Sequence, residues 1–498
     1  MRASAPGFFS LIRLLTGLVG IGTPVLLAKA LSITDFAIYA TITAASGLML
    51  VVSNLGLDRA CLRLLPSHAG AVALSSLARF MAMLMLPRMA ALALVLVLVI
   101  ASGIWLPVGS GANYSALLLI LLSLSSGASQ MSAAFMQGLL MHGAYAVIVF
   151  LSVVLRFVWL LVLILLGETL HYAQVIEIFI AVELLSLLAQ SAAIVWFTLR
   201  GEITSSRSKA MPTLRDVFKV SGANYFTYLA GIPWMGNSQV LLVGVFCSHE
   251  IIAAFAFFQN LIERAKPFMP VRLLQIYVEP QWAKLHQADG RVRRFQAPLA
   301  TLQKSNALLL SLGLVLIFTV GDALLRQFTR PLYADQILLL GLVLMQQATG
   351  SIADLLWMGI NATNQVDKLV RAFSLISLGA APLLIPAVMF GGAEGMIVWT
   401  WMLPILLLIL LRHSGVHFAQ LMHQTRKTML LLLAGLVAGW IGGAFQTIAE
   451  PGMQTLAAAL LIGMVVWLAL LMLVKPFNRA ERHLLKRFVS TKRSAAKS

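Results

Sequence analysis

The sequence has few charged residues. Only 11% of its 498 residues are Asp, Glu, Lys or Arg, whereas a soluble domain carries about a quarter. Acidic residues are the scarcer sign, with 18 Asp and Glu against 36 Lys and Arg. This shortage of charge excludes a soluble globular chain and indicates a membrane protein.

Cysteine is almost absent, with only Cys61 and Cys247 in the chain. These two are predicted to lie on opposite sides of the membrane, so a disulfide would have to cross the bilayer and both are expected to be free thiols. The nine His are scattered, and no Cys and His group has metal-ligand spacing. A glycine-rich phosphate loop is also missing, which excludes an ATPase. We therefore expect no metal, no cofactor and no enzymatic activity.

Long apolar runs fill almost the whole chain. Hydrophobic residues make up 60% of it, and the mean hydropathy is +0.91. A transmembrane helix needs about 20 mostly apolar residues. The predicted helices are 8–30, 36–57, 80–106, 115–140, 145–167, 173–199, 222–246, 254–278, 299–320, 335–358, 369–390, 396–411, 428–448 and 455–474. The fold class is therefore all-α, a polytopic membrane protein with about 14 transmembrane helices. The loops between them are too short for the site of an outer-face polymerase or glycosyltransferase.

The net charge of +18 could indicate nucleic-acid binding, but its distribution indicates a membrane orientation instead. Most Lys and Arg fall in segments on one side of the predicted helices, and the opposite side has only Lys29, Arg326 and Arg330. Cytoplasmic loops carry such an excess. We therefore expect both termini in the cytoplasm and no nucleic-acid partner.

The first 30 residues resemble a signal peptide that ends in Ala28-Lys29-Ala30. Arg13, however, interrupts the apolar core, and further spans follow at once. We expect an uncleaved first helix.

One polar linker, 200–221, separates six predicted helices from eight. A faint internal echo between Gly138 and Gly359, offset by 221 residues, favours a six-plus-six repeat. We therefore predict an N-terminal lobe at 1–199, a C-terminal lobe at 222–411, two added helices within 412–474 and a basic tail at 475–498. The tail is expected to be solvated or to anchor at the lipid surface, and a specific partner site is the alternative.

Ionisable residues inside the membrane mark function by default, with pairing as the alternative. Arg156 lies near the middle of helix 145–167, and Glu183 lies at the same depth in helix 173–199. Either the two form a structural ion pair or Arg156 faces a polar cavity.

A second cluster of charges lies in helix 254–278. Gln259, Glu263 and Lys266 follow helical spacing on one face, and Arg264 lies beside them. Pro267 and Pro270 interrupt the helix, which favours a cavity-lining role.

Other helices add isolated charges and a flexible face. The face of helix 8–30 carries Arg13, which could also snorkel to the inner surface, and the hinge candidates Gly17, Gly20 and Pro24. Helix 335–358 contributes Asp354, which either lines water or bonds between helices.

Arg88 leaves two alternatives open. It is a surface residue if Pro87 starts its helix, and it is buried if the helix starts near Phe80.

Together these residues predict a cavity with an excess of positive charge, which suits an anionic substrate, because arginine binds phosphate through paired donors. The candidate substrate-binding residues are Arg13, Arg88, Arg156, Arg264 and Lys266. The candidates for binding a coupling H⁺ or Na⁺ are Glu183, Glu263 and Asp354.

Several segments resemble the polysaccharide-exporter branch of the MOP flippase superfamily. The resemblance rests on loose motifs in consistent order, at Asp35 and Tyr39, then Gly56, Leu57, Arg63 and Pro66, then Pro280, Ala283 and Gly290, and finally Lys368, Gly392 and Gly395.

This resemblance implies two six-helix lobes, as in the MOP and MATE proteins, around a cationic cavity, with two extra C-terminal helices. It also implies that an undecaprenyl-diphosphate-linked oligosaccharide, a polysaccharide repeat unit such as that of O-antigen, is moved between leaflets. The resemblance further implies a bacterial inner membrane as the location and a polysaccharide polymerase as a possible partner. The prolines in helix 254–278 depart from the family pattern.

Three alternatives stay open: a cation-coupled multidrug antiporter of the same fold, a lipid II flippase, and a membrane scaffold without transport activity.

Overall fold

The computed structural model describes residues 6–68, 74–102, 112–204, 212–272, 293–362, 366–413, 419–448, 452–478 and 481. These residues form helices and turns and include no strand. Among them, twelve helical segments are long and apolar enough to cross a membrane. The predicted all-α, multi-pass membrane fold is therefore confirmed.

The helix count agrees with the fourteen stretches predicted from the sequence. One candidate span, Asp367–Arg412, covers the two helices predicted at 369–390 and 396–411. The helix predicted at 254–278 begins as α10 (His249–Ala265), whose 17 residues are slightly short of a full span. The other candidate spans overlap the remaining predicted helices one by one.

The helices divide into two compact units, Met1–Arg264 and Ala265–Ser498. This division differs from the predicted lobe boundary at the 200–221 linker, because α8, α9 and α10 pack with the helices that precede them. The predicted assignment of lobes concerns how the helices move as groups, and it stays a prediction.

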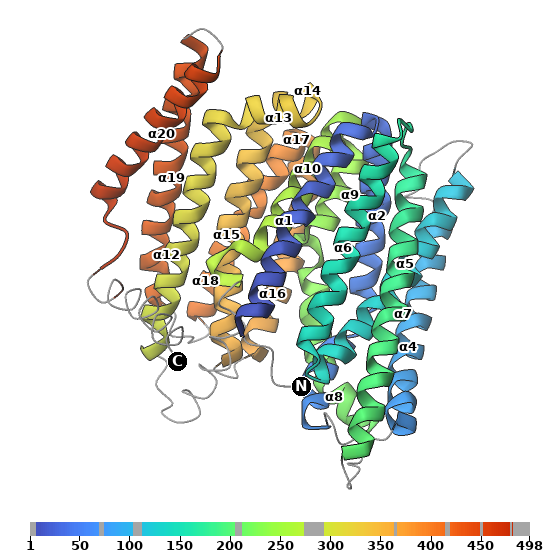
Figure 1. Cartoon of the computed structure of the whole chain (residues 1–498). Coiled ribbons are helices and arrows are strands. Elements are labelled where there is room, and N and C mark those ends of the chain that lie inside the picture. The colour runs from blue at the N-terminus through green and yellow to red at the C-terminus, as the bar shows by residue number, and fades with distance from the viewer. Residues whose placement is uncertain are drawn as a thin grey trace. The chain divides into compact units, whose positions relative to one another are not determined.

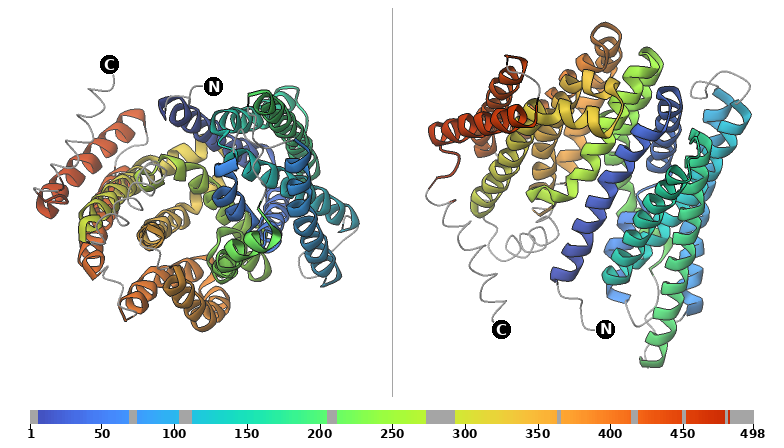
Figure 2. Two further views of the ribbon diagram at one scale, coloured as in Figure 1. Left: turned by 90° about the horizontal axis from the view of Figure 1, so that it is seen from below. Right: turned by 45° about the horizontal axis from the view of Figure 1, so that its top comes forward.

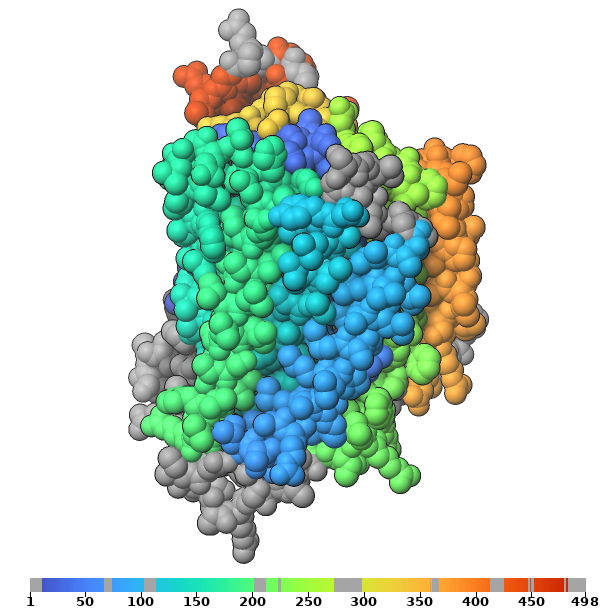
Figure 3. Space-filling model, turned by 90° about the vertical axis from the view of Figure 1, so that its right-hand side faces the viewer, coloured from blue at the N-terminus to red at the C-terminus, as the bar shows by residue number. Residues whose placement is uncertain are grey.

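The described residues of unit 1 form ten α-helices, most of which are labelled in Figure 1. They are α1 (Pro6–Ala30), α2 (Ile33–Val52), α3 (Leu57–Leu64), α4 (Leu74–Ser102), α5 (Ala112–Gly138), α6 (His142–Leu165), α7 (Tyr172–Thr204), α8 (Leu214–Gly231), α9 (Gly236–Phe246) and α10. Helix α1 packs against α6, α5 against α7, and α2 against α9. In the space-filling view, α4 and α7 lie side by side on one face of this unit (Figure 3).

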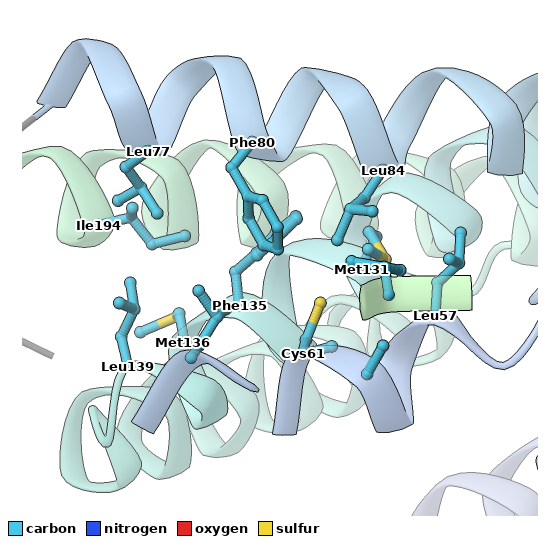
Figure 4. Close-up of a cluster of buried hydrophobic side chains, with 14 of the residues drawn as sticks. Leu57, Cys61, Leu77, Phe80, Leu84, Met131, Phe135, Met136, Leu139 and Ile194 are labelled. Atoms are coloured by element: carbon cyan, nitrogen blue, oxygen red, sulfur yellow. The ribbon is translucent and has the colours of Figure 1, made fainter. Parts of the chain in front are cut away.

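A buried apolar cluster holds α3, α4 and α5 together. Phe80 and Leu84 of α4 point toward Phe135 and Met131 of α5, and Leu77 of α4 lies beside Ile194 (Figure 4). The two phenyl rings meet edge to face with their centroids 6.4 Å apart. Burial of large apolar side chains stabilises such contacts even where neighbouring surfaces face lipid. The cluster fixes α3 to the body of unit 1.

Unit 2 continues with the remaining helices. They are α12 (Arg293–Leu316), α13 (Asp322–Phe328), α14 (Pro331–Asp335), α15 (Ile337–Ala362), α16 (Val366–Ala380), α17 (Leu384–Thr400), α18 (Met402–His413), α19 (Ala419–Ile448) and α20 (Met453–Val474). A π-helical turn at Ile317–Gly321 joins α12 to α13. Helix α17 bends at Gly392, whose φ of +61° is readily adopted only by glycine.

The two added C-terminal helices belong to the body of unit 2. Figure 2 shows α19 and α20 beside α12, and both pack on it directly. Gly435 lies so close to α12 that a Cβ there would be 2.4 Å from the carbonyl oxygen of Ser311. The indole of Trp467 donates to the hydroxyl of Ser311 at 3.1 Å. Small residues permit such backbone approach between membrane helices.

The predicted helix 254–278 is wrong as a single continuous element. Helix α10 ends at Ala265, and a 3₁₀ turn follows at Lys266–Phe268. Pro267 lacks the N–H that an α-helix would use, and Met269, which precedes Pro270, is extended with ψ 136°. The prolines therefore end this helix. The part of the prediction that falls on 273–278 lies outside the described residues.

The prediction of a solvated basic tail is wrong at Glu481. Both oxygens of its carboxylate accept from Nζ of Lys304 on α12, at 2.7 and 2.8 Å, and both side chains are buried. The backbone N–H of Asn478 also donates to this carboxylate. A charge can be buried where another neutralises it, and the segment after α20 is therefore fixed to unit 2. Residues 482–498 lie outside the described part of the chain.

Candidate functional site

Arg156 of α6 forms an ion pair with Glu183 of α7 inside unit 1. Nη2 of Arg156 donates to Oε1 of Glu183, and the side chains are 16% and 19% exposed. The guanidinium also lies over the ring of Phe179, with Cζ 5.1 Å from its centroid. Of the two alternatives for Arg156, the ion pair with Glu183 holds in this structure. Nε of Arg156 nevertheless remains buried without a hydrogen-bond partner.

Arg264 lies near the end of α10 and is exposed. Its side chain crosses Gly20 of α1, where a Cβ would be 3.3 Å from Cδ of Arg264. Arg264 forms no ion pair or hydrogen bond with any residue in the described part of the chain. It interacts electrostatically with Arg156, Glu183, Glu263 and Tyr39. A guanidinium without a fixed partner therefore lies within reach of the Arg156–Glu183 pair.

Aromatic side chains support this arrangement. Tyr39 of α2 meets the ring of Phe179 edge to face, with centroids 5.8 Å apart. Phe36, one turn earlier, packs on Tyr39 at 5.8 Å and on Phe257 of α10 at 6.3 Å. This chain of rings links α7, α2 and α10, the helices that carry Glu183, Tyr39 and Arg264. It positions the two arginines on a common scaffold.

Arg13 of α1 lies at the edge of the same group. It is half-buried, and both Arg13 and Glu183 interact electrostatically with the hydroxyl of Tyr145 on α6. The structure thus brings three of the predicted cations, Arg13, Arg156 and Arg264, together with the carboxylate of Glu183. We call these four residues the arginine cluster. Its excess of positive charge suits a phosphate group, which each guanidinium can bind through two parallel hydrogen bonds.

Arg88 does not belong to the arginine cluster. Helix α4 begins at Leu74 and includes Pro87, so the buried alternative holds, and Arg88 is only 1% exposed. Its Nη2 donates to Oε1 of Gln130 at 3.0 Å, and Nη1 contacts the sulfur of Met131 at 3.5 Å. Both partners lie on α5. The predicted role of Arg88 in binding substrate has no support from this enclosed position.

Lys266 is placed differently from the prediction, whereas Glu263 lies on the predicted helix. Because α10 ends at Ala265, Lys266 belongs to the 3₁₀ turn and does not continue the helical face of Gln259 and Glu263. Glu263 is exposed at the last turn of α10.

Asp354 is paired with a cation in unit 2. Its Oδ1 accepts from Nη2 of Arg272 at 2.9 Å, and both side chains are partly exposed. Two of the three predicted coupling carboxylates, Glu183 and Asp354, are therefore bound to an arginine in this structure.

The predicted hinge in α1 is a continuous helix here. Pro24 lies inside Pro6–Ala30, and Gly17, Gly20 and Pro24 are buried. Gly20 provides the space that Arg264 occupies, a function that spacing alone did not reveal.

The described residues include no candidate set of metal ligands. In that part of the chain, no group of three or more His, Cys, Asp or Glu could hold a metal ion.

Sequence reasoning missed several residues that shape the site. Phe179 and Tyr145 lie on apolar helices at ordinary spacing, where aromatic residues usually indicate packing. Tyr39 belongs to the family motif with Asp35, and that motif does not indicate which side chains the Tyr39 ring contacts. The motif at Pro280, Ala283 and Gly290 lies outside the described residues. Only tertiary contact distinguishes aromatic rings beside an arginine from those that face lipid.

Known proteins resemble this chain in sequence family and in fold. A family model described as polysaccharide biosynthesis protein matches residues 7–266, more than half of the chain. No curated protein gives a sequence match.

Two solved structures share the fold. The lipid II flippase MurJ in an inward closed conformation superposes with a TM-score of 0.61 at 15% identity, over 93% of this chain and 97% of that one. An inward-facing multidrug resistance MATE family transporter of the MOP superfamily gives 0.54 at 13% identity, over 82% and 99%. Identities this low establish the fold alone. The family match and the shared fold together show that the chain belongs to the polysaccharide biosynthesis protein family and has the fold of the MOP superfamily.

Proposed function

We propose that this protein is a flippase for a lipid-linked oligosaccharide. The substrate is an undecaprenyl-diphosphate-linked polysaccharide repeat unit, which moves from the inner to the outer leaflet of a bacterial cytoplasmic membrane by alternating access. No covalent bond is made or broken, so the protein is not an enzyme. Both termini lie in the cytoplasm, and a polysaccharide polymerase uses the product. Family membership supports the polysaccharide, and the arginine cluster supports the diphosphate.

The exposed and unpaired guanidinium of Arg264 is the observation that carries this proposal. Among the described residues it has no fixed partner, and it lies beside Arg156, whose Nε is also unsatisfied. Donors held ready in a low-dielectric site bind an anion more strongly than they would in water. A diphosphate offers enough oxygens to engage both guanidinium groups. The prenyl chain stays in the lipid, where it needs no protein contact.

Glu183 is the coupling carboxylate that this arrangement favours. While ionised it holds Arg156, and it repels a phosphate that approaches the arginine cluster. An H⁺ or Na⁺ bound to Glu183 would release Arg156 for the substrate, and one charge moved through 100 mV supplies about 2.3 kcal/mol. Glu263 and Asp354 are the alternative ion sites.

Deletion of the gene tests the function. We expect a prenyl-diphosphate oligosaccharide to accumulate on the cytoplasmic leaflet and surface polysaccharide to disappear. The wild-type chain should reverse both effects, whereas Arg264→Ala and Arg156→Ala should not, at equal protein levels in the membrane. Arg326→Ala serves as the control, because Arg326 pairs with Asp322 and Asp335 outside the arginine cluster. Full export by Arg264→Ala would refute its assignment.

Other accumulating substances would select an alternative. Build-up of lipid II would indicate a lipid II flippase. Unchanged lipid intermediates with a loss of resistance to cationic dyes would indicate a drug antiporter. If all the cations of the arginine cluster can be removed from a stable protein without any transport defect, a scaffold role would replace the proposal.

A further inference from the structure

The corner between α2 and α3 fits tightly against α8. Leu55 and Gly56 both have positive φ, at +52° and +71°, which turns the chain sharply before α3. A Cβ on Gly56 would lie 2.4 Å from the carbonyl oxygen of Ser221 on α8. Glycine is therefore required here both by the backbone conformation and by the neighbouring helix. This is the Gly-Leu motif at Gly56 and Leu57, which the substrate site does not use.

Hydrogen bonds complete the contact on either side of Gly56. The hydroxyl of Tyr225 donates to the backbone oxygen of Val52 at 2.9 Å. Nε of Arg59 donates to the hydroxyl of Tyr228 at 2.9 Å, and that hydroxyl donates to Oδ2 of Asp58 at 3.4 Å. We call this contact the α3–α8 latch, formed by Val52, Gly56, Asp58 and Arg59 on one side and Ser221, Tyr225 and Tyr228 on the other.

Helix α3 packs in an apolar cluster that also contains residues of α4, α5 and α8, among them the buried Val217 of α8. Leu57 and Cys61 are buried in the apolar cluster beside Met131 and Leu84 (Figure 4). Behind them, the buried guanidinium of Arg88 interacts electrostatically with Asp58 and Cys61. The polar contacts of the latch, by contrast, include exposed groups such as Arg59. Exposed hydrogen bonds are readily replaced by hydrogen bonds to water, so the polar contacts are the part of the latch that separates at the least cost.

The latch joins parts of the chain that the sequence assigns to different lobes. Residues 52–59 belong to the predicted N-terminal lobe, and α8 leads from the linker into the predicted C-terminal lobe. Both segments are predicted to lie on the cytoplasmic side. If the lobes move as alternating access requires, these contacts must break in every cycle.

We infer that the α3–α8 latch is a cytoplasmic gate, closed in this structure, which opens to admit the substrate. The inference rests on the proposed function in one respect, the movement of the lobes. It does not depend on which lipid is carried.

Solvent access to Ser221 tests the gate directly. Ser221 is 1% exposed beneath Gly56, so Ser221→Cys, with Cys61 and Cys247 replaced by Ser, should react with a maleimide in membranes only when the latch opens. Tyr228→Phe removes the hydroxyl that bonds both Arg59 and Asp58. We expect it to accelerate labelling roughly 5- to 30-fold, the effect of one or two lost interactions. Complete protection of Ser221→Cys in cells that export at the normal rate would overturn the inference.

Cross-linking tests whether opening is needed for transport. Arg59→Cys and Tyr228→Cys, in the same background, are joined by a reducible bis-methanethiosulfonate reagent, with each single variant as control. Export should stop in the cross-linked double variant alone and return after reduction. Continued export by fully cross-linked protein would show that the latch is static.

These outcomes separate the gate from the proposed substrate. If gene deletion leaves lipid intermediates unchanged but Ser221→Cys is labelled faster in Tyr228→Phe, the substrate is wrong and the gate stands. If deletion causes accumulation and cross-linking has no effect, the flippase stands and the gate is wrong.

Discussion

Gly56→Ala is the substitution whose effect the structure determines most sharply. The added methyl group would meet the carbonyl oxygen of Ser221 at 2.4 Å and its Cα at 3.2 Å. Both atoms belong to the backbone of α8, so no side-chain rotation can relieve the contact. The residue must also hold a φ of +71°. Alanine can be accommodated only if the corner moves away from α8.

The size of the effect follows from these two costs. A non-glycine residue in the left-handed region costs about 1–2 kcal/mol, and an added methyl group in a packed contact costs typically 1–3 kcal/mol. The closed latch should therefore lose about 2–5 kcal/mol. At about 1.4 kcal/mol per tenfold change, the open population rises by a factor of roughly 30 to several thousand.

Gly222→Ala is the matched control, because it adds the same methyl group at the next position of α8. No atom lies within 4 Å of the site where its Cβ would be placed. In a helix interior, alanine is favoured over glycine by up to about 1 kcal/mol. Maleimide labelling of Ser221→Cys in both backgrounds measures the difference. If Gly56→Ala is labelled no faster than Gly222→Ala and both proteins unfold at the same temperature, the argument from close approach is refuted.

Three further predictions concern parts of the chain away from the gate. Lys304→Met alone should lower the stability of the protein by about 3–5 kcal/mol, because it leaves the buried carboxylate of Glu481 unpaired. Thermal unfolding should show that adding Glu481→Leu restores most of this stability. An equal loss in the single and double variants would contradict the pairing. Burial, together with the nearby carboxylate of Asp58, raises the pKa of the Cys61 thiol to about 12. Since only the thiolate reacts, Cys61 should resist alkylation at pH 9.5, where its thiolate fraction stays below about 1%. The half-buried Cys247 should be modified under the same conditions. Rapid modification of both thiols in the folded protein would contradict the burial of Cys61. Gly435→Leu should separate α19 from α12 and lower the unfolding temperature, because the side chain would meet the α12 backbone; unchanged stability would show that the close packing is not required.

The ion pair between Arg156 and Glu183 illustrates what can be predicted from the sequence. The equal depth of Arg156 and Glu183 followed from counting residues along two adjacent helices, because each residue of a helix advances by a fixed rise. Their ion pair was one of two alternatives, and contact between α6 and α7 selected it. The same counting failed at α10. It extended a helical face through Pro267, although a residue without an N–H ends an α-helix where no neighbour compensates.

Burial of the remaining arginines could not be read from the sequence. Arg88 and Arg264 both fall within predicted transmembrane helices, yet one is enclosed against α5 and the other is exposed beside Gly20. The difference depends on which helices pack against each face. Hydropathy carries no such information, because a face toward lipid and a face toward another helix are equally apolar.

The sequence by itself determined the class of the protein, its helical segments and its excess of positive charge inside the membrane. These properties are local, since the length of an apolar run and the residues within it decide whether a helix can cross the bilayer. The tertiary structure alone decided which charges are paired, which are free and which segments touch. Lys304 and Glu481 are 177 residues apart and meet in a buried ion pair, and Gly56 meets Ser221 across the latch. Such contacts depend on the packing of distant helices, which no local pattern specifies.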